Sequence, residues 1–320
     1  MSDARTGASV PDSVVILGAG TMGGGMALAF AGAGSRVWLV ARHERTLQRA
    51  MTAMRNSLGR LEGTGPARDG ETNVLHRVRV ATDLAEVDFD ADLVVESIPE
   101  VLDDKRELLR RVEDRSSEAT IVVSNTSSLP LPALSDGLRR PHRFAGYHWF
   151  NPPELVELVE VVPAPGTEPE VVRTLVAWSH GIGKRPVAIT REIEGFVANR
   201  LQYALIREAY ALVEAGVCSM EDVDAVVTAG LGPRWSAVGP FETMDLAGLD
   251  VHRAVARSLF PTLSNAAEPP PWLEAFLARG ALGVKSGEGM LGTYEAAAIE
   301  ALVRRRARTL IAIARLHAED

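Results

Sequence analysis

The sequence predicts an α/β fold with a doubly wound sheet, followed by an all-α C-terminal domain. Two observations predict this order. Through about residue 190, short runs of branched aliphatic residues alternate with helix-like segments, as a parallel sheet with crossover helices requires. From Gly195 onward, apolar residues recur at helical spacing, and Gly and Pro clusters separate the segments. We therefore expect two domains, at residues 1–190 and 191–320.

The alternating part begins with a strand, a glycine-rich turn and a helix of small residues. Val14–Leu17 is the strand and residues 18–23 are the turn, which is the order of a dinucleotide-binding Rossmann unit. Gly18 permits the tight turn, Gly20 lets the backbone approach a pyrophosphate, and Gly23 allows the helix to pack closely. The cofactor-binding residues expected in this turn are Gly18, Gly20, Thr21, Met22 and Gly23.

The remaining elements follow from the same patterns. Strands are expected at 36–40, 78–81, 93–96, 121–124, 144–148, 156–162 and 186–189, with a helix at 44–61 and a polar loop at 62–73. Thr167 and Glu170 have the spacing of a capping box, which predicts a helix that begins there and ends near Gly181. The tail at 295–316 is expected to form one amphipathic helix, and its basic patch at 304–306 is interpreted as a solvated face.

Composition restricts the class of protein. A chain of 320 residues with 46% hydrophobic content can form two domains with sizeable cores. A net charge of −8 disfavours nucleic acid or an anionic membrane as partner, and the single Cys218 excludes an internal disulfide framework. No secretory signal is recognisable, so we expect a cytoplasmic protein. Residues 13–35 are uncharged and could suggest a membrane span, but their many glycines and the change from strand to helix argue against it.

The segment Gly146–Pro153 and the apolar run after it bring together a histidine and a carboxylate. Glu160 lies among branched aliphatic residues, where a carboxylate is unstable unless a cation or a hydrogen-bond donor meets it. His148 is the obvious partner, and an imidazole held by a carboxylate suits general acid–base chemistry near neutral pH. Alternatively, His148 caps a turn before Pro152 and Glu160 lies on a solvated strand edge. No metal ion is expected.

Seven motifs occur in the order in which they appear in the 3-hydroxyacyl-CoA dehydrogenase family, so the chain resembles that family over nearly its whole length. The motifs are Gly18–Gly23, Val94–Glu100, Ser124–Ser128, His148–Pro152, Glu160, Gly195–Arg200 and Gly239–Phe241. Within the family, Asn199–Tyr203 and Gly230–Trp235 look like the branch that contains L-gulonate 3-dehydrogenase (lambda-crystallin) and L-carnitine dehydrogenase. The resemblance to that branch implies oxidation of a free 3-hydroxy acid.

The resemblance implies roles in hydride transfer for four side chains. His148 would be the acid/base, Glu160 its orienting carboxylate, Ser127 a hydroxyl that hydrogen-bonds the reacting oxygen, and Asn199 a donor that polarises the same oxygen. Hydride leaves a carbinol carbon only as the hydroxyl proton departs, so a base within about 3 Å and donors to the oxygen are required. Taken alone, Ser127 and Asn199 could merely cap the segments that follow them.

The resemblance also implies that Glu100, Lys105 and Lys285 contact the cofactor, although Lys105 could instead lie on a solvated helix face. The second strand departs from the family. An acid usually follows it and binds the ribose 2′-hydroxyl, whereas this chain has Ala41 and Arg42. No carboxylate then repels a 2′-phosphate, and an arginine can bind one. The cofactor is therefore expected to be NAD or NADP, with NADP slightly favoured; alternatively, Arg42 only stacks on the adenine.

Arg234 and Trp235 are the predicted substrate-binding residues, placed in a loop between two helices of the second domain. An arginine there could grip a carboxylate with two parallel hydrogen bonds. The alternative is a surface arginine that pairs with Glu242 or Asp245.

Three functions are compatible with these residues. The leading hypothesis is an NAD(P)-dependent dehydrogenase of a small, polar 3-hydroxy acid, acting as a homodimer through its helical domain. A dehydrogenase of 3-hydroxyacyl thioesters of CoA or a carrier protein is the second, but residues 59–71 offer two arginines against three acids to hold a CoA nucleotide. The third is a non-catalytic, crystallin-like protein that binds a nucleotide, and it would need none of the four catalytic side chains.

Overall fold

The computed structural model describes residues 9–61 and 71–319 of the chain. These residues form two compact units. The first comprises the chain to Val197 together with the end of the last helix from Leu310, and the second comprises Ala198–Thr309. We refer to them as the sheet unit and the helical unit. None of the described helices is both long and apolar enough to cross a membrane.

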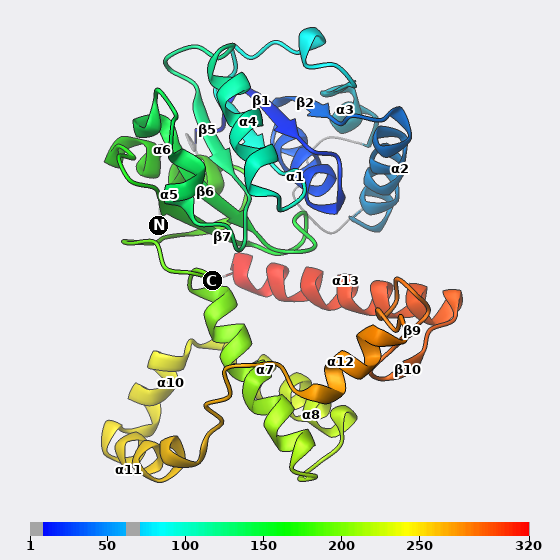
Figure 1. The fold of residues 1–320 in the computed structure, drawn as a ribbon, viewed down its shortest axis with the longest axis vertical. Coiled ribbons are helices and arrows are strands. Elements are labelled where there is room, and N and C mark those ends of the chain that lie inside the picture. The colour runs from blue at the N-terminus through cyan, green and yellow to red at the C-terminus, as the bar shows by residue number, and fades with distance from the viewer. Residues whose placement is uncertain (1–8, 62–70, 320) are drawn as a thin grey trace. The chain divides into compact units, whose positions relative to one another are not determined.

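An eight-stranded sheet forms the centre of the sheet unit, in the order β3-β2-β1-β4-β5-β6-β7-β8 (Figure 1). Its strands are β1 Ser13–Leu17, β2 Arg36–Val40, β3 Val78–Ala81, β4 Leu93–Glu96, β5 Ile121–Ser124, β6 Phe144–Trp149, β7 Leu158–Pro163 and β8 Arg185–Ala188. Neighbouring strands are parallel except β6 and β7, which are antiparallel. The winding direction changes between β1 and β4, and dinucleotides bind in the crevice at such a switch point.

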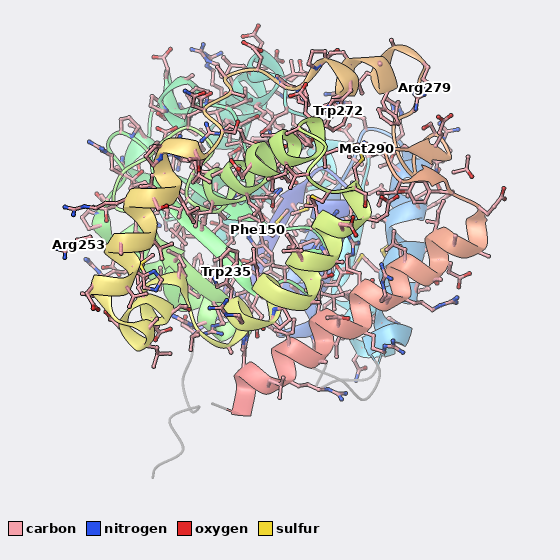
Figure 2. The ribbon with its side chains drawn as sticks, turned by 90° about the horizontal axis from the view of Figure 1, so that it is seen from below. Phe150, Trp235, Arg253, Trp272, Arg279 and Met290 are labelled. Atoms are coloured by element: carbon pink, nitrogen blue, oxygen red, sulfur yellow. The ribbon has the colours of Figure 1, made fainter. Side chains whose placement is uncertain are left out.

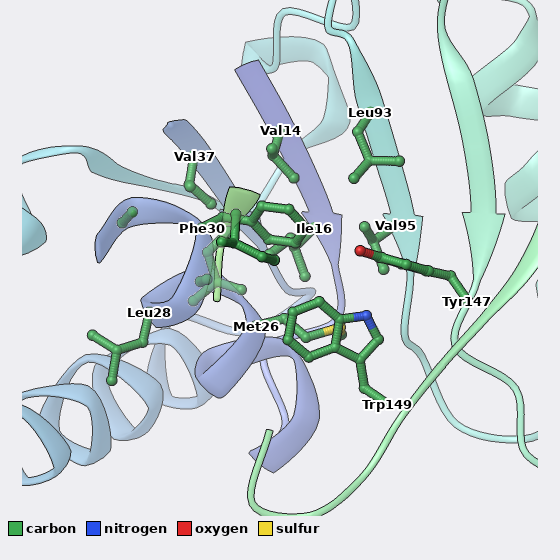
Figure 3. Packing of buried hydrophobic residues seen from close by; sticks show 14 of the residues in the cluster. Val14, Ile16, Met26, Leu28, Phe30, Val37, Leu93, Val95, Tyr147 and Trp149 are labelled. Carbon is green, nitrogen blue, oxygen red and sulfur yellow. The ribbon is translucent and has the colours of Figure 1, made fainter. Parts of the chain in front are cut away.

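Helices cover both faces of the sheet, because successive residues of a buried strand point to opposite sides. Val14 faces a core shared with α1, α2 and α6, while Val15 faces a core shared with α4 and α5. These helices are α1 Thr21–Gly32, α2 Glu44–Leu61, α4 Leu102–Glu113, α5 Leu131–Ser135 and α6 Pro169–Gly181. Figure 3 shows the first core, in which Phe30 of α1 packs against Trp149 of β6 with ring centroids 5.6 Å apart. The predicted doubly wound α/β fold is confirmed.

The helical unit consists of short helices, a small hairpin and part of the long last helix (Figure 1). Its elements are α7 Ala198–Glu214, α8 Met220–Val226, α9 Gly232–Ala237, α10 Pro240–Ala247, α11 Leu249–Leu259, α12 Pro271–Ala278, β9 Glu288–Gly289, β10 Gly292–Thr293 and α13 Ala296–Glu319. Residues 198–309, all of which the structure describes, bury no large apolar side chain. Their buried residues are Pro270, Ala281, Gly289 and Ala307.

Two predicted boundaries are wrong. The polar loop expected at 62–73 lies partly outside the described residues, but its last part is helical, because Glu71–His76 form α3. Thr167 does not cap α6. Its hydroxyl donates to the carbonyl oxygen of Phe144 at 2.5 Å and accepts the N–H of Ala164 at 2.8 Å, so it closes the turn before the helix instead.

Candidate active site

The turn after β1 is as tight as its glycines suggest. Gly18 has φ +113°, and a Cβ there would lie 2.2 Å from the carbonyl oxygen of Ser97. A Cβ at Gly23 would lie 1.7 Å from the carbonyl oxygen of Gly18, which shows how closely the helix packs on the turn. A Cβ at Gly20 would meet no described atom within 4 Å. The backbone at Gly20 therefore faces open space, as the approach of a pyrophosphate requires.

Helix α1 begins at Thr21, directly after Gly20, and no side chain among the described residues caps its first turn. The first N–H groups of a helix lack partners within the helix, and the helix dipole favours an anion beside them. Thr21 and Met22 lie in this first turn. The residues present thus fit the diphosphate of a dinucleotide, while contact of the individual side chains with it stays a prediction.

Arg42 follows the end of β2 by two residues, at the carboxyl edge of the sheet. Its Nη2 lies 3.4 Å from Oδ2 of Asp104, near the start of α4, and the two side chains are 73% and 50% exposed. An ion pair of this length in water contributes little to stability. The guanidinium is therefore accessible to a ligand at the edge where the ribose of a bound dinucleotide lies.

His148 and Glu160 face each other across the antiparallel strands β6 and β7, whose register pairs them directly. Nδ1 of His148 lies 2.8 Å from Oε2 of Glu160, and both side chains are buried. The other carboxylate oxygen, Oε1, accepts the N–H of Val197 at 3.0 Å. Glu160 does not lie on a solvated edge. If Nδ1 carries the proton shared with the carboxylate, Nε2 is the nitrogen that can accept one.

Two phenylalanines and a strained turn hold this pair. The ring centroids of Phe150 and Phe196 lie 4.4 and 5.4 Å from that of His148. Gly195 and Phe196 have φ angles of +74° and +50°, and the second is unusual for a residue with a side chain. Such a conformation is unfavourable by about 1–3 kcal/mol and tends to occur at functional sites. Here it directs the N–H of Val197 onto the carboxylate.

Lys105 is buried in the sheet unit, with 1% of its side chain exposed, so it does not lie on a solvated helix face. Its Nζ lies 2.7 Å from Oε1 of Glu96 and 3.0 Å from Oε2 of Glu100. Glu96 is completed by the hydroxyl of Ser124, which donates to its Oε2 at 2.5 Å. Two carboxylates thus compensate one buried ammonium. Direct contact of Lys105 with a cofactor stays a prediction.

Glu100 connects this ion pair to the loop that carries Ser127. Its Oε1 accepts the hydroxyl of Thr126 at 2.6 Å and the N–H of Ser127 at 2.9 Å. Burial raises the pKa of Glu100, but the hydrogen bond from Thr126 and the charge of Lys105 outweigh burial, so the pKa lies below its usual value. Glu100 is therefore a carboxylate at neutral pH, and it fixes the backbone of the loop after β5.

The other four predicted site residues belong to the helical unit. Asn199 is the second residue of α7, and Lys285 is exposed shortly before β9. Arg234 and Trp235 lie within helix α9, so their predicted placement in a loop is wrong. Trp235, which Figure 2 labels, is exposed.

The predicted local partners of Arg234 do not engage it. Among the described residues, neither Glu242 nor Asp245 forms an ion pair with its guanidinium. Glu242 instead accepts the N–H of Gly239 at 3.0 Å and so caps α10. The described ranges 9–61 and 71–319 also contain no group of three or more His, Cys, Asp or Glu residues arranged to hold a metal ion.

Both parts of the chain match one protein family. Residues 13–193 match the 3-hydroxyacyl-CoA dehydrogenase, NAD binding domain, and residues 195–293 match the 3-hydroxyacyl-CoA dehydrogenase, C-terminal domain. The chain belongs to the 3-hydroxyacyl-CoA dehydrogenase family. It is thus a member of a family of NAD-dependent oxidoreductases, which confirms the resemblance inferred from the seven motifs.

Three relatives illustrate the range of the family. The 5-formyl-3-hydroxy-2-methylpyridine 4-carboxylate 5-dehydrogenase of Mesorhizobium japonicum is 35% identical over 95% of this chain and 97% of its own. A crystal structure of an enzyme of that kind, described as an NAD+ dependent dismutase, has a TM-score of 0.89 at 34% identity and covers 96% of this chain and 98% of its own. The mitochondrial hydroxyacyl-coenzyme A dehydrogenase of Sus scrofa is 36% identical, covering 86% and 89%. The lambda-crystallin homolog of Bos taurus is 39% identical, covering 76% of each chain.

Four residues of this family member's site were not singled out from the sequence. Phe150 and Phe196 flank the imidazole, Val197 donates to Glu160, and Thr126 donates to Glu100. Phe150, Phe196, Val197 and Thr126 lie inside motifs on which the resemblance rests. Their place in a motif was therefore the available signal, because none is a residue type that transfers protons.

Proposed function

We propose that this chain is an NAD(P)-dependent dehydrogenase that transfers a hydride between the nicotinamide and the 3-hydroxyl carbon of a small, polar 3-hydroxy acid. The observation that carries the proposal is the buried pair of His148 and Glu160, with Nδ1 and Oε2 2.8 Å apart. A buried carboxylate on one side of an imidazole stabilises the imidazolium that forms when the other nitrogen accepts a proton. A protein that only binds a nucleotide has no use for this arrangement.

In the oxidative direction, Nε2 of His148 accepts the hydroxyl proton while the carbinol carbon loses a hydride and becomes a carbonyl carbon. The bound nicotinamide supplies the hydride acceptor. Glu160 keeps the imidazole in orientation, and Ser127, whose N–H is anchored by Glu100 at 2.9 Å, offers its hydroxyl to the reacting oxygen. Asn199, the second residue of α7, is the proposed donor that polarises the same oxygen. The reduction of the ketone reverses these steps.

Two features favour a free acid over a thioester. The Mesorhizobium relative, which matches nearly the whole chain, is named for a free pyridine carboxylate. Arg234 and Trp235 lie side by side on α9, both exposed, and the guanidinium can bind a carboxylate with two hydrogen bonds. The similarity to the mitochondrial hydroxyacyl-coenzyme A dehydrogenase of Sus scrofa supports the second candidate, a 3-hydroxyacyl-CoA substrate.

The helical unit supports the proposal of a homodimer. Phe241, Leu246 and Phe260 are 79%, 78% and 72% exposed, and the unit buries no large apolar side chain of its own. Large apolar side chains left exposed in this way are typical of an interface. A second copy of the chain presents the same surface and can cover it through a two-fold axis.

A substrate screen tests the proposal. Purified protein is mixed with NAD+ or NADP+ and with free 3-hydroxy acids or 3-hydroxyacyl-CoA thioesters, and the absorbance of the reduced nicotinamide is followed. Turnover of a free acid is the expected result. Turnover of thioesters alone overturns the free-acid part and supports the second candidate. Tight binding of the dinucleotide without turnover of either class overturns the enzymatic proposal.

A further inference from the structure

Residues 150–157 connect the two halves of the catalytic pair. They join the end of β6, which carries His148, to the start of β7, which carries Glu160. The distance between Nδ1 and Oε2 therefore depends on how this connection is held, because a shift of one strand end relative to the other moves one side chain and not its partner.

Lys184 holds the main chain of this connection. It lies directly before β8, and its side chain is buried. Its Nζ donates to the carbonyl oxygen of Pro153 at 2.6 Å and to that of Val156 at 2.8 Å. The same ammonium lies 5.1 Å from the ring centroid of Trp149, within the range of a cation–π interaction. Trp149 adjoins His148 in β6, so the cation touches both the connection and the strand before it.

This arrangement is unfavourable for a lysine. Burial lowers the pKa of Lys184 to about 8, although the negative charges of Glu154 and Glu157 partly offset the effect of burial. An apolar residue of similar length would avoid the loss of hydration, but it could not donate to two carbonyl oxygens. Perturbed groups of this kind concentrate at functional sites, and none of the proton-transfer steps proposed above uses Lys184.

Other contacts fasten the side chains of the same connection. The hydroxyl of Ser57 donates to Oε1 of Glu154 at 2.7 Å, and Nδ1 of His317 lies 2.8 Å from Oε2 of Glu157. Gly25 of α1 lies so close that a Cβ there would be 2.4 Å from Cγ of Pro153. The helix that begins at the dinucleotide turn is thus packed directly against the connection. Lys184 adds hydrogen bonds to the main chain of residues 150–157.

We propose that Lys184 is a positioning residue for the reaction, which fixes residues 150–157 and thereby keeps His148 aligned with Glu160 and with the substrate hydroxyl. The inference rests on the proposed dehydrogenase function. Lys184 thus acts through the position of His148 and does not itself contact the substrate.

The test compares Lys184→Met with Arg185→Met. Met keeps the length of the lysine side chain but donates no hydrogen bond, and Arg185 is the exposed neighbour whose side chain has no described hydrogen bond or ion pair, so it serves as the matched control. The probes are 3-hydroxybutyrate and 3-hydroxybutyryl-CoA, each with deuterium at the carbinol carbon. Misplacement of a catalytic group by about 1 Å lowers rates by about 10²-fold, so kcat should fall by about 10–10²-fold in Lys184→Met alone.

Two further readouts separate positioning from a loss of folded protein. The primary isotope effect on kcat should rise in Lys184→Met, because slower hydride transfer then limits turnover more strongly than in the wild type. Amide hydrogen exchange within residues 150–157 should also become faster, while the Kd for the dinucleotide is unchanged. A smaller population of intact enzyme would lower kcat without changing the isotope effect.

An unchanged isotope effect and unchanged exchange in residues 150–157 of Lys184→Met overturn the inference. If Lys184→Met does not fold, Lys184→Gln, which keeps two N–H donors, is measured in the same way and should show a smaller change of the same sign. If the wild type oxidises neither probe, the proposed function fails for these substrates, whereas the exchange measurement still decides whether Lys184 holds the connection.

Discussion

Large apolar side chains are mostly buried in the sheet unit and mostly exposed in the helical unit. In the sheet unit, Phe30 and Tyr147 are completely buried, whereas Phe241 and Phe260 of the helical unit are mostly exposed. The sheet unit supplies its own core, so the geometry of the dinucleotide turn and of the His148 pair is set within it. The helical unit lacks such a core, and we infer that it is completed by a second copy of the chain.

Because of this difference, only residues of the sheet unit can be tested one at a time within a complete set of neighbours. Substitutions in the sheet unit change groups whose neighbours are described, so each has a defined expectation. Substitutions in the helical unit can also change the exposed apolar surface that we propose a second copy of the chain covers.

The largest effect is expected at His148. His148→Gln removes the proton acceptor and should lower turnover by about 10²–10⁴-fold, with the dinucleotide Kd unchanged, because the side chain meets Glu160 and not the glycine turn. Glu160→Gln should also be slow, since it loses the charge that stabilises the imidazolium. Steady-state kinetics and fluorescence titration with NADH measure both quantities. His180→Gln, on the exposed face of α6, is the control. Near-normal turnover of folded His148→Gln contradicts the mechanism.

The next effect concerns the pH dependence of stability. Burial lowers the pKa of Lys184 in the folded chain to about 8, whereas a lysine in contact with water has an ordinary pKa of 10.5. Between these values the unfolded chain binds more protons, so the free energy of unfolding rises with pH, by up to about 3 kcal/mol in total. Urea unfolding across this range should show the rise in the wild type and not in Lys184→Met. A wild type and a variant with parallel pH profiles contradict the burial of a charged Lys184.

Tyr147 limits this measurement at high pH. Burial raises the pKa of Tyr147 above its ordinary value, so the unfolded chain loses the phenolic proton first and stability falls above pH 10. The comparison therefore stops at about pH 9.5, where more than half of the contribution of Lys184 is developed and that of Tyr147 is small.

The mass of the protein in solution tests whether a second copy covers the helical unit. We expect twice the 34.4 kDa of one chain by sedimentation. Leu246→Asp combined with Phe260→Asp should weaken the dimer by about 10²-fold or more, because burial of each such side chain contributes about 1.5–3 kcal/mol. Val80→Asp, at an exposed apolar position of the sheet unit, is the control. A wild type that sediments as a stable single chain contradicts completion by a second copy.

A smaller effect is expected at Arg234. Arg234→Met should raise the KM for a free hydroxy acid by about tenfold or more, as expected for loss of a charge-assisted hydrogen bond. NAD(P) affinity should hardly change. Arg253→Met removes another arginine of the helical unit (Figure 2) and should leave the KM unaltered. If 3-hydroxyacyl-CoA alone is turned over, and equally well by Arg234→Met, the thioester candidate replaces the free acid.

The smallest effect is expected at Arg42, which is largely exposed and therefore screened by water. Arg42→Ala should weaken the binding of NADPH by about tenfold, which is the lower end of the range for loss of a charge-assisted contact to phosphate. The affinity for NADH should be unchanged. Titration of both reduced cofactors measures the difference, with Arg45→Ala as the control. A wild type that strongly prefers NADH, with both affinities unaltered by Arg42→Ala, contradicts a site for the 2′-phosphate.

Local pattern was enough to predict where most strands lie, because most of them are short runs rich in apolar residues. Strands β2 to β5 agree with their predicted residues, and Gly18 and Gly23 have the close contacts that the turn requires. The meeting of His148 with Glu160 could also be predicted, since both lie on consecutive strands and a buried carboxylate needs a partner. In this case the need of a buried carboxylate for a partner was enough to pair the two residues before the fold was known.

The tertiary structure alone decided which charged side chains are buried. Lys105 could have been read as a solvated helix residue, and Lys184 had no signal in its neighbours, yet both ammonium groups lie inside the sheet unit. Thr167 likewise fits a capping box in sequence, but its hydroxyl donates to the carbonyl oxygen of Phe144 in β6. The environment of a polar side chain depends on the carboxylates and carbonyl groups that distant segments bring to it. Periodicity along the chain carries no information about those partners.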